Sequence, residues 1–169
     1  MSIAELGALG EFVASFGVLA TLIYLAIQMR QNTQALRLNT AQVVTEELQQ
    51  MFSLLASDEG LSKVFVEAGK ISNLSDVNKV RYFTFTSNIM RVCENAYLQN
   101  RENAIGAEHW EGVVRMMVDY SKMSAFEDYW ANRKHWMSNE FQRFMDSEII
   151  PRPAKAGVDI PGRYASSDA

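Results

Sequence analysis

The chain has 169 residues, 48% of them hydrophobic and 21% charged, which is the length and composition of a folded protein with one domain-sized core rather than of a disordered chain. Its formal net charge of −4 lacks the basic excess that binding to nucleic-acid phosphates requires. The single cysteine, Cys93, excludes an intramolecular disulfide and a cysteine-based zinc or iron–sulfur site.

The first predicted element is an apolar helix near the N-terminus. No charged side chain occurs in the 18 residues from Phe12 to Met29, which would form a helix about 27 Å long, against a hydrocarbon core of about 30 Å in a bilayer. A cleaved signal peptide is not expected, because the only charges before Arg30 are two glutamates. We expect residues 1–29 to be a retained transmembrane anchor; the alternative is a buried core helix of a soluble bundle.

Basic residues first appear directly after the apolar stretch, at Arg30 and Arg37. The positive-inside rule therefore predicts that the N-terminus lies outside and that the following domain lies in the cytoplasm. Tyr24 lies near the inner end of the stretch, where interfacial aromatic residues meet the lipid headgroups.

Small residues recur along one stripe of this predicted helix. They are Ala4, Gly7, Gly10, Ala14, Gly17 and Thr21. Small side chains let helix backbones approach closely in lipid, so the stripe predicts self-association or docking on another membrane helix. The alternative is that glycine and alanine are simply common in membrane helices.

Neither proline nor glycine occurs between Gln28 and Gln34, so we expect the anchor to continue into the domain as one long helix. A new apolar face then begins at helical spacing and should contact the domain. Its members are Leu36, Val44, Leu48, Met51 and Leu55.

Two helices should follow. A short helix from Glu59 to Ala68 has Ser57 and Asp58 as candidate caps and Gly69 at its end. A long helix begins at Ser75 and runs to about Glu102, and its wide apolar face predicts a central position. The positions expected to face inward are Leu61, Val64, Phe65 and Ala68 in the first and Val77, Val80, Phe83, Ile89, Met90, Cys93, Ala96 and Tyr97 in the second.

Three more helical segments are predicted. Gly106 precedes a helix from Ala107 to Ser121, and the capping box Ser124-Ala-Phe-Glu127 predicts a helix that begins at Ala125. Ser138 is the candidate cap of the last segment. The residues of the first that are expected to face inward are Trp110, Val113, Val114 and Met117. The other two carry the apolar and aromatic residues Phe126, Tyr129, Trp130, Trp136, Phe141, Phe144, Met145 and Ile149.

The predicted fold class is all-α, with one N-terminal transmembrane helix that continues into a cytoplasmic helical bundle. No segment shows the alternation of a strand. All three prolines lie beyond Ile150. The predicted parts are therefore the anchor, residues 1–29, the bundle domain, residues 30–150, and a mobile tail, residues 151–169.

Residues that could carry chemistry are few. The sequence has no glycine-rich phosphate loop and no His-Glu-x-x-His motif. His109 lies beside Glu108 and Glu111, but residues one or two positions apart point to different sides of a helix, so neither a metal site nor a cofactor is expected. Cys93 lies on an apolar helix face and is expected to pack rather than to react.

The most distinctive polar cluster lies on the long central helix. It consists of Arg91, Glu94, Asn95, Tyr97 and Gln99. Arg91 and Glu94 are three residues apart and can pair, and a buried pair needs further hydrogen bonds, which Trp110 or Tyr129 could supply. Two interpretations stay open: a structural network that fixes how the helices dock, or the floor of a small pocket.

Three segments resemble a group of bacterial proteins that combine an N-terminal membrane helix with a short helical domain. They are Ile23-Tyr-Leu-Ala-Ile-Gln-Met-Arg-Gln-Asn-Thr-Gln-Ala-Leu36, then Arg91-Val-Cys-Glu-Asn-Ala-Tyr97 with Gln99, and then Trp110 with Phe126-Glu-Asp-Tyr-Trp130. The resemblance implies this architecture and a bacterial origin, and hence the inner (cytoplasmic) membrane. It implies no mechanism, because the group has no established activity.

These features favour a membrane-anchored interaction or accessory protein, not an enzyme, that contacts lipid and either a second copy or another membrane protein through the small-residue stripe. The alternative is a membrane-tethered sensor or carrier of a small apolar ligand, held in the bundle near Arg91 and Glu94. A hydrolase at the membrane face is the weakest hypothesis, because the sequence indicates no nucleophile–base pair.

Overall fold

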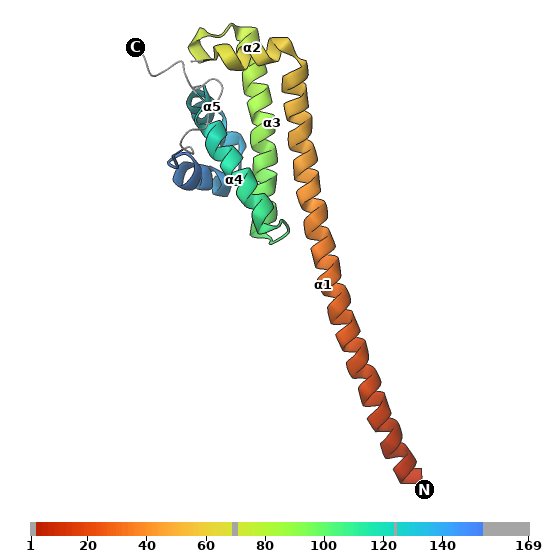
Figure 1. Cartoon of the computed structure of the whole chain (residues 1–169). Coiled ribbons are helices and arrows are strands. Elements are labelled where there is room, and N and C mark those ends of the chain that lie inside the picture. The colour runs from red at the N-terminus through yellow and green to blue at the C-terminus, as the bar shows by residue number, and fades with distance from the viewer. Residues whose placement is uncertain (1–2, 69–70, 124, 154–169) are drawn as a thin grey trace.

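A computed structural model describes residues 3–68, 71–123 and 125–153 of the chain, apart from a few side chains near the N-terminus. Within these ranges every regular element is helical and no strand occurs, which confirms the all-α fold class. One helix, much longer than the others, extends away from a small bundle that contains all the remaining elements (Figure 1).

The longest helix, α1 (Ile3–Ser57), has 55 residues and is about 82 Å long. It contains no proline, and its last glycine is Gly17. The prediction that the apolar N-terminal segment continues into the domain as one helix is confirmed. Every described side chain from residue 3 to residue 39 is exposed, and we call this part of α1 the shaft.

The bundle packs the end of α1 against a set of shorter helices. The second-longest helix, α3, runs back alongside α1 and also contacts α2, α4 and α5, so it is the central helix, as predicted (Figure 1). The elements that follow α1 are α2 (Glu59–Glu67), the 3₁₀ turn η1 (Ile71–Asn73), α3 (Asp76–Arg101), α4 (Ala107–Ser121), α5 (Phe126–Arg133), the 3₁₀ turn η2 (Lys134–Trp136), α6 (Asn139–Phe144) and the π-helical turn η3 (Met145–Ile149).

Three helices begin at the side-chain caps that the sequence predicts. Asp58, Ser75 and Ser138 each accept a hydrogen bond from the amide three residues further on, at 3.0, 3.3 and 3.4 Å. Such a bond satisfies one of the amides that a helix leaves unpaired at its start. Asp58, and not Ser57, is therefore the cap of α2.

The start of α5 differs slightly from its prediction. The helix begins at Phe126 and not at Ala125, which instead takes the N-cap position without a side-chain hydrogen bond. The predicted cap Ser124 and the predicted helix-ending Gly69 lie outside the described residues, as does the tail from residue 154.

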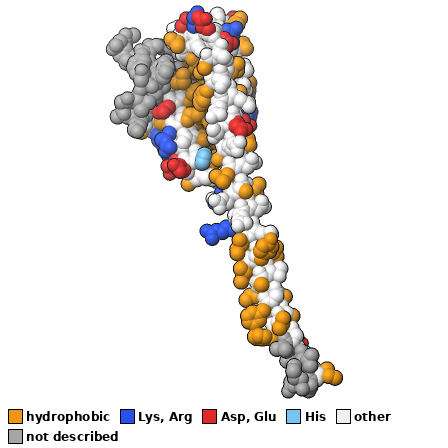
Figure 2. All heavy atoms as spheres, turned by 45° about the vertical axis from the view of Figure 1, so that its right-hand side comes forward, with side chains coloured by type: hydrophobic (Ala, Val, Ile, Leu, Met, Phe, Trp, Pro, Cys, Tyr) orange, Lys and Arg blue, Asp and Glu red, His pale blue; other side chains and the backbone are white. Residues whose placement is uncertain are grey.

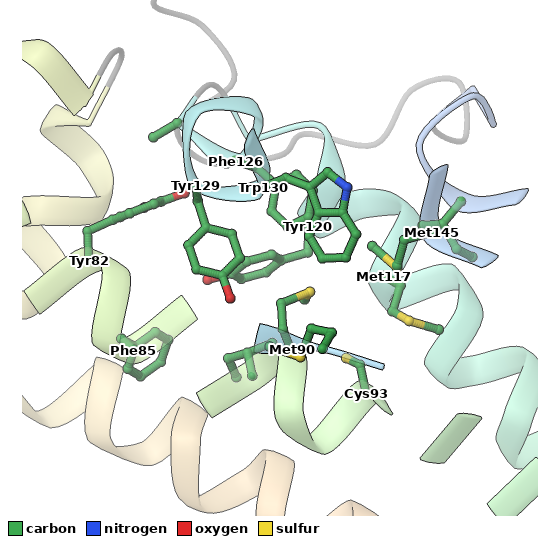
Figure 3. Close-up of a cluster of buried hydrophobic side chains, with 14 of the residues drawn as sticks. Tyr82, Phe85, Met90, Cys93, Met117, Tyr120, Phe126, Tyr129, Trp130 and Met145 are labelled. Carbon is green, nitrogen blue, oxygen red and sulfur yellow. The ribbon is translucent and has the colours of Figure 1, made fainter. Parts of the chain in front are cut away.

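The core lies between α3 and the helices around it. Met90 and Cys93 of α3 are fully buried and face aromatic and methionine side chains from α4, α5 and η3 (Figure 3). The predicted inward residues of α2 are all buried. So are most of those in the later helices, with Phe83, Tyr97, Trp110, Val114 and Phe144 packed against the core and partly buried.

Three residues on apolar faces that were expected to pack inward, Val77, Val80 and Leu36, are exposed instead, and so is Trp136. Val77 and Val80 lie in the first turns of α3 and are each 65% exposed, and the buried residues of this helix begin only at Tyr82. Trp136 is 49% exposed, and the guanidinium carbon of Arg133 lies 4.9 Å from its ring centroid.

Leu36 is the fourth exposed residue. The bundle first contacts α1 through Arg37, whose Nε donates to the backbone carbonyl of Asn103 at 2.8 Å. Leu36 points away from this contact and is 57% exposed. The buried face of α1 instead begins at Ala41 and Val44 and continues through the partly buried Leu48, Met51 and Leu55.

Candidate functional site

The Arg91–Glu94 pair predicted on α3 is present and joins three elements. Arg91 Nη1 lies 2.8 Å from Glu94 Oε2, and the side chain of Glu94 is only 7% exposed whereas that of Arg91 is 59% exposed. The second carboxylate oxygen of Glu94 accepts the amide of Ser138 at 2.6 Å, and Arg91 Nη2 donates to the carbonyl of Trp136 at 3.1 Å. The pair therefore ties α3 to the junction between η2 and α6.

The partners of this pair differ from those predicted. The sequence indicates Trp110 or Tyr129 as the hydrogen-bond partner, but the partners are the backbone groups of Trp136 and Ser138. A backbone amide or carbonyl has no signature in the sequence, so no sequence signal could have identified them. The Ser138 amide lies at the N-terminus of α6, where the helix dipole adds to the attraction of a carboxylate.

Asn95 lies with Arg91 and Glu94 in an open groove between α1 and α3. The volume of this groove is about 590 Å³. Its lining is formed by Glu47, Gln50, Met51, Asn88, Arg91, Val92, Glu94, Asn95 and Leu98. Pockets for small apolar ligands are mostly enclosed, so this open groove, which both polar and apolar side chains line, suits the surface of a partner better than a small apolar ligand.

Tyr97 and Trp110 belong to a different environment. The ring of Tyr97 stacks on that of Phe144 with centroids 4.8 Å apart, and Trp110 lies 5.7 Å from the same ring. These contacts join α3, α4 and α6. Gln99 is half-buried near the end of α3, where its backbone carbonyl accepts the amide of Ala104 at 2.8 Å. The predicted cluster is thus divided between a groove, an aromatic contact and a turn.

A second polar contact joins α5 and η2 to η3. Trp130 Nε1 donates to Asp146 Oδ1 at 2.7 Å, and Lys134 Nζ lies 3.0 Å from Asp146 Oδ2. Partial burial raises the pKa of Asp146, but the hydrogen bonds from Trp130 and Lys134 outweigh it and hold the pKa below its usual value. Sequence reasoning missed this contact, because Asp146 lies twelve residues beyond Lys134 and no local pattern relates them.

Burial holds two titratable groups of the core, Cys93 and Tyr120, in their neutral forms. Burial raises the pKa of the Cys93 thiol to about 12, which opposes formation of the reactive thiolate. Burial also raises the pKa of Tyr120, whose hydroxyl lies 3.1 Å from Thr86 Oγ1. Among the described residues, no group of three or more histidine, cysteine, aspartate or glutamate side chains is arranged to hold a metal ion.

The second candidate site is the shaft. A Cβ atom built on Gly7, Gly10 or Gly17 would meet no atom within 4 Å, and Ala14 and Thr21 are exposed, so the described part of the small-residue stripe faces open space. The side chain of Ala4 lies outside the described set.

Large apolar side chains gather on the part of the shaft nearer the N-terminus, as Figure 2 shows, whereas most of the charged side chains in this view lie on the bundle. The helix is long and apolar enough to cross a membrane. None of its most apolar stretch is buried inside the bundle, unlike the core helix of a soluble protein.

No model of a protein family matches the chain, and no curated protein and no solved structure matches it. The resemblance to a group of bacterial membrane proteins and the bacterial origin it implies therefore stay predictions.

Proposed function

We propose that this chain is a membrane-tethered interaction or accessory protein, whose shaft crosses a bilayer and whose bundle meets a partner on the cytoplasmic side. The observation that carries the proposal is the exposure of every side chain from Phe12 to Met29, a stretch without charge. Removing apolar surface from water is worth about 25 cal/mol per Å². A helix that is apolar on all sides is therefore stable in lipid and unfavourable in water.

The hydroxyl groups of the apolar stretch are satisfied within the helix, as a lipid environment requires. Ser15 Oγ donates to the carbonyl of Glu11 and Thr21 Oγ1 to that of Gly17, both at 2.8 Å. A hydroxyl in hydrocarbon has no water to bind, and a bond to the carbonyl four residues earlier satisfies it within the helix.

The short distance between the apolar stretch and the bundle indicates where a partner would be met. Arg37, which contacts the Asn103 loop, lies eight residues after Met29, about 12 Å along the helix. The headgroup layer on one side of a bilayer is about 5–8 Å thick. The bundle would therefore begin just beyond the headgroups, with Arg30 and Arg37 at the level that favours the cytoplasmic side.

The bundle itself supports contact rather than catalysis. The carboxylate of Glu94 is engaged by Arg91 and by the Ser138 amide, and the thiol of Cys93 is buried with a raised pKa. The open groove between α1 and α3 instead offers polar side chains to another macromolecule.

Alkaline carbonate extraction of membranes from cells that express the full chain tests the proposal. The chain should stay in the membrane pellet, and Leu22→Arg should be released, because a cation in the middle of a bilayer costs about 2.5–3.5 kcal/mol. Leu38→Arg is the matched control, since Leu38 is as exposed as Leu22 (60% and 57%) but lies beyond the apolar stretch. Release of the unaltered chain, or equal release of both variants, would overturn the proposal.

A further inference from the structure

A second stripe on α1 differs from the small-residue stripe and continues beyond the apolar stretch. Its residues follow one another at alternating steps of four and three. They are Val18, Leu22, Leu25, Met29, Asn32, Leu36, Asn39 and Val43. We call this set the seam. An average spacing of 3.5 residues is the repeat with which two α-helices pack along each other in a left-handed coiled coil.

The bundle of the same chain does not cover the seam. Val43 is 41% exposed and Leu36 is 57% exposed, although both are large apolar residues on the part of α1 beyond the apolar stretch. The neighbouring Val44, about 100° further round the helix, is 2% exposed and contacts the core. The bundle thus occupies one side of α1 and leaves the seam open beside it.

The charges on α1 are distributed as a symmetric pairing requires. In a parallel pair with two-fold symmetry each seam residue meets its own copy, so a charge there would repel itself. The only charged residues between Phe12 and Thr45 are Arg30 and Arg37, which lie seven residues apart on one side of the helix, away from the seam. Arg37 is directed to its own bundle through Asn103. The uncharged surface ends at Glu46 and Glu47.

We propose that a second copy of this chain packs in parallel along the seam from Val18 to Val43, so that the helices pair both inside the bilayer and above it. The parallel direction rests on the proposed function, because two copies tethered to one membrane share their orientation. Asn32 and Asn39 would each meet their own copy, where the two amides can hydrogen-bond to each other across the pair. The pairing covers Leu36 and Val43, which the fold of the single chain leaves exposed.

Disulfide cross-linking in native membranes tests the proposal with single substitutions. Leu36→Cys and Val43→Cys place thiols on the seam, and Leu38→Cys is the matched control, at 60% exposure on the opposite side of α1. The native Cys93 is fully buried and can stay in place. Oxidation of the unaltered chain measures how much covalent dimer Cys93 itself gives. Because a disulfide requires Cα atoms about 4.4–6.8 Å apart, mild oxidation should give roughly tenfold more covalent dimer with either seam cysteine than with Leu38→Cys.

A second pair of variants tests whether the packing is specific. With Val43→Cys as the reporter, Leu36→Glu should reduce the cross-linked dimer several-fold, because it places two carboxylates opposite each other, whereas Leu38→Glu should leave it unchanged. Neither position is buried, so both variants should keep the thermal unfolding temperature of the bundle.

Equal cross-linking at all three positions, or none, would overturn the seam, and so would a product whose mass shows a different protein. Carbonate extraction of the same samples separates the two proposals: a chain that stays in the membrane without cross-linking at the seam contradicts the pairing alone. A chain that is extracted yet cross-links at the seam contradicts the tether alone.

Discussion

The shaft and the bundle contain residues of the same type in opposite environments. Phe16 on the shaft is 58% exposed and Phe141 in the bundle is 0% exposed, and Leu22 and Leu61 differ in the same way, at 57% and 6%. The bundle gains its stability from contacts within the chain. The shaft makes few contacts within the chain, so the stability of its apolar surface depends on the medium that surrounds it. A substitution should therefore have different consequences in the two parts, even where the chemistry of the change is identical.

The largest expected difference between the two parts comes from removing one aromatic ring. Phe141→Ala should lower the free energy of unfolding of the bundle by about 3–5 kcal/mol, because it opens a cavity in a filled core. Phe16→Ala should change it by less than about 0.5 kcal/mol, since an exposed ring leaves no cavity behind. Denaturant unfolding in detergent, followed by near-ultraviolet circular dichroism, measures both. A comparable loss in the two variants would show that the shaft belongs to the same cooperative unit.

The buried carboxylate of the bundle should give the next effect. Glu94→Ala leaves the Ser138 amide and Arg91 without their partner and should lower the free energy of unfolding by about 1–3 kcal/mol. Glu94→Gln keeps an acceptor for the amide and should lose less. The exposed Glu102→Ala is the control and should be nearly neutral. Loss of stability in the control but not in Glu94→Ala would contradict a structural role for the pair.

The smallest expected effect is a stabilisation by Asp146 that is lost only in acid. The hydrogen bonds from Trp130 and Lys134 hold the folded pKa of Asp146 below its usual value, so the folded state binds this proton less readily than the unfolded state. The stabilisation by Asp146 is therefore complete above the unfolded pKa and is lost as the pH falls through the lower, folded pKa. Its size should stay below about 1 kcal/mol, because the Lys134 pair is nearly half exposed.

Comparison with Asp146→Asn isolates this effect. The asparagine oxygen can still accept from Trp130, but the attraction to Lys134 is lost. The difference in unfolding free energy between the unaltered chain and the variant should be constant near neutral pH and shrink below about pH 4. A difference that grows in acid would show that Asp146 is not stabilised in its charged form.

The sequence predicted the features that depend on local bonds. Asp58, Ser75 and Ser138 cap the helices expected, because a cap joins a side chain to an amide three residues away. The continuity of α1 was also predictable, since it follows from the lack of residues that break a helix.

The features that depend on neighbouring helices were not predictable from the sequence. Val77 and Val80 fit an apolar face, yet both are exposed, because none of the elements that the structure describes covers them. The partners of Arg91 and Glu94 are backbone groups, and only the docking of α6 brings them near. The separation of Tyr97 and Trp110 from the Arg91 groove likewise follows from the aromatic contact with Phe144.

The contact between Arg37 and Asn103 has a mechanical consequence. It lies on a helix that contains neither glycine nor proline from Val18 to Ser57, so nothing in that stretch acts as a swivel between the apolar stretch and the bundle. A rotation of the shaft about its own axis would carry α3 round with it through the same angle. If the shaft shifted by one residue relative to a neighbouring helix, the bundle would turn by about 100°. The groove between α1 and α3 would then face a different neighbour at the same height.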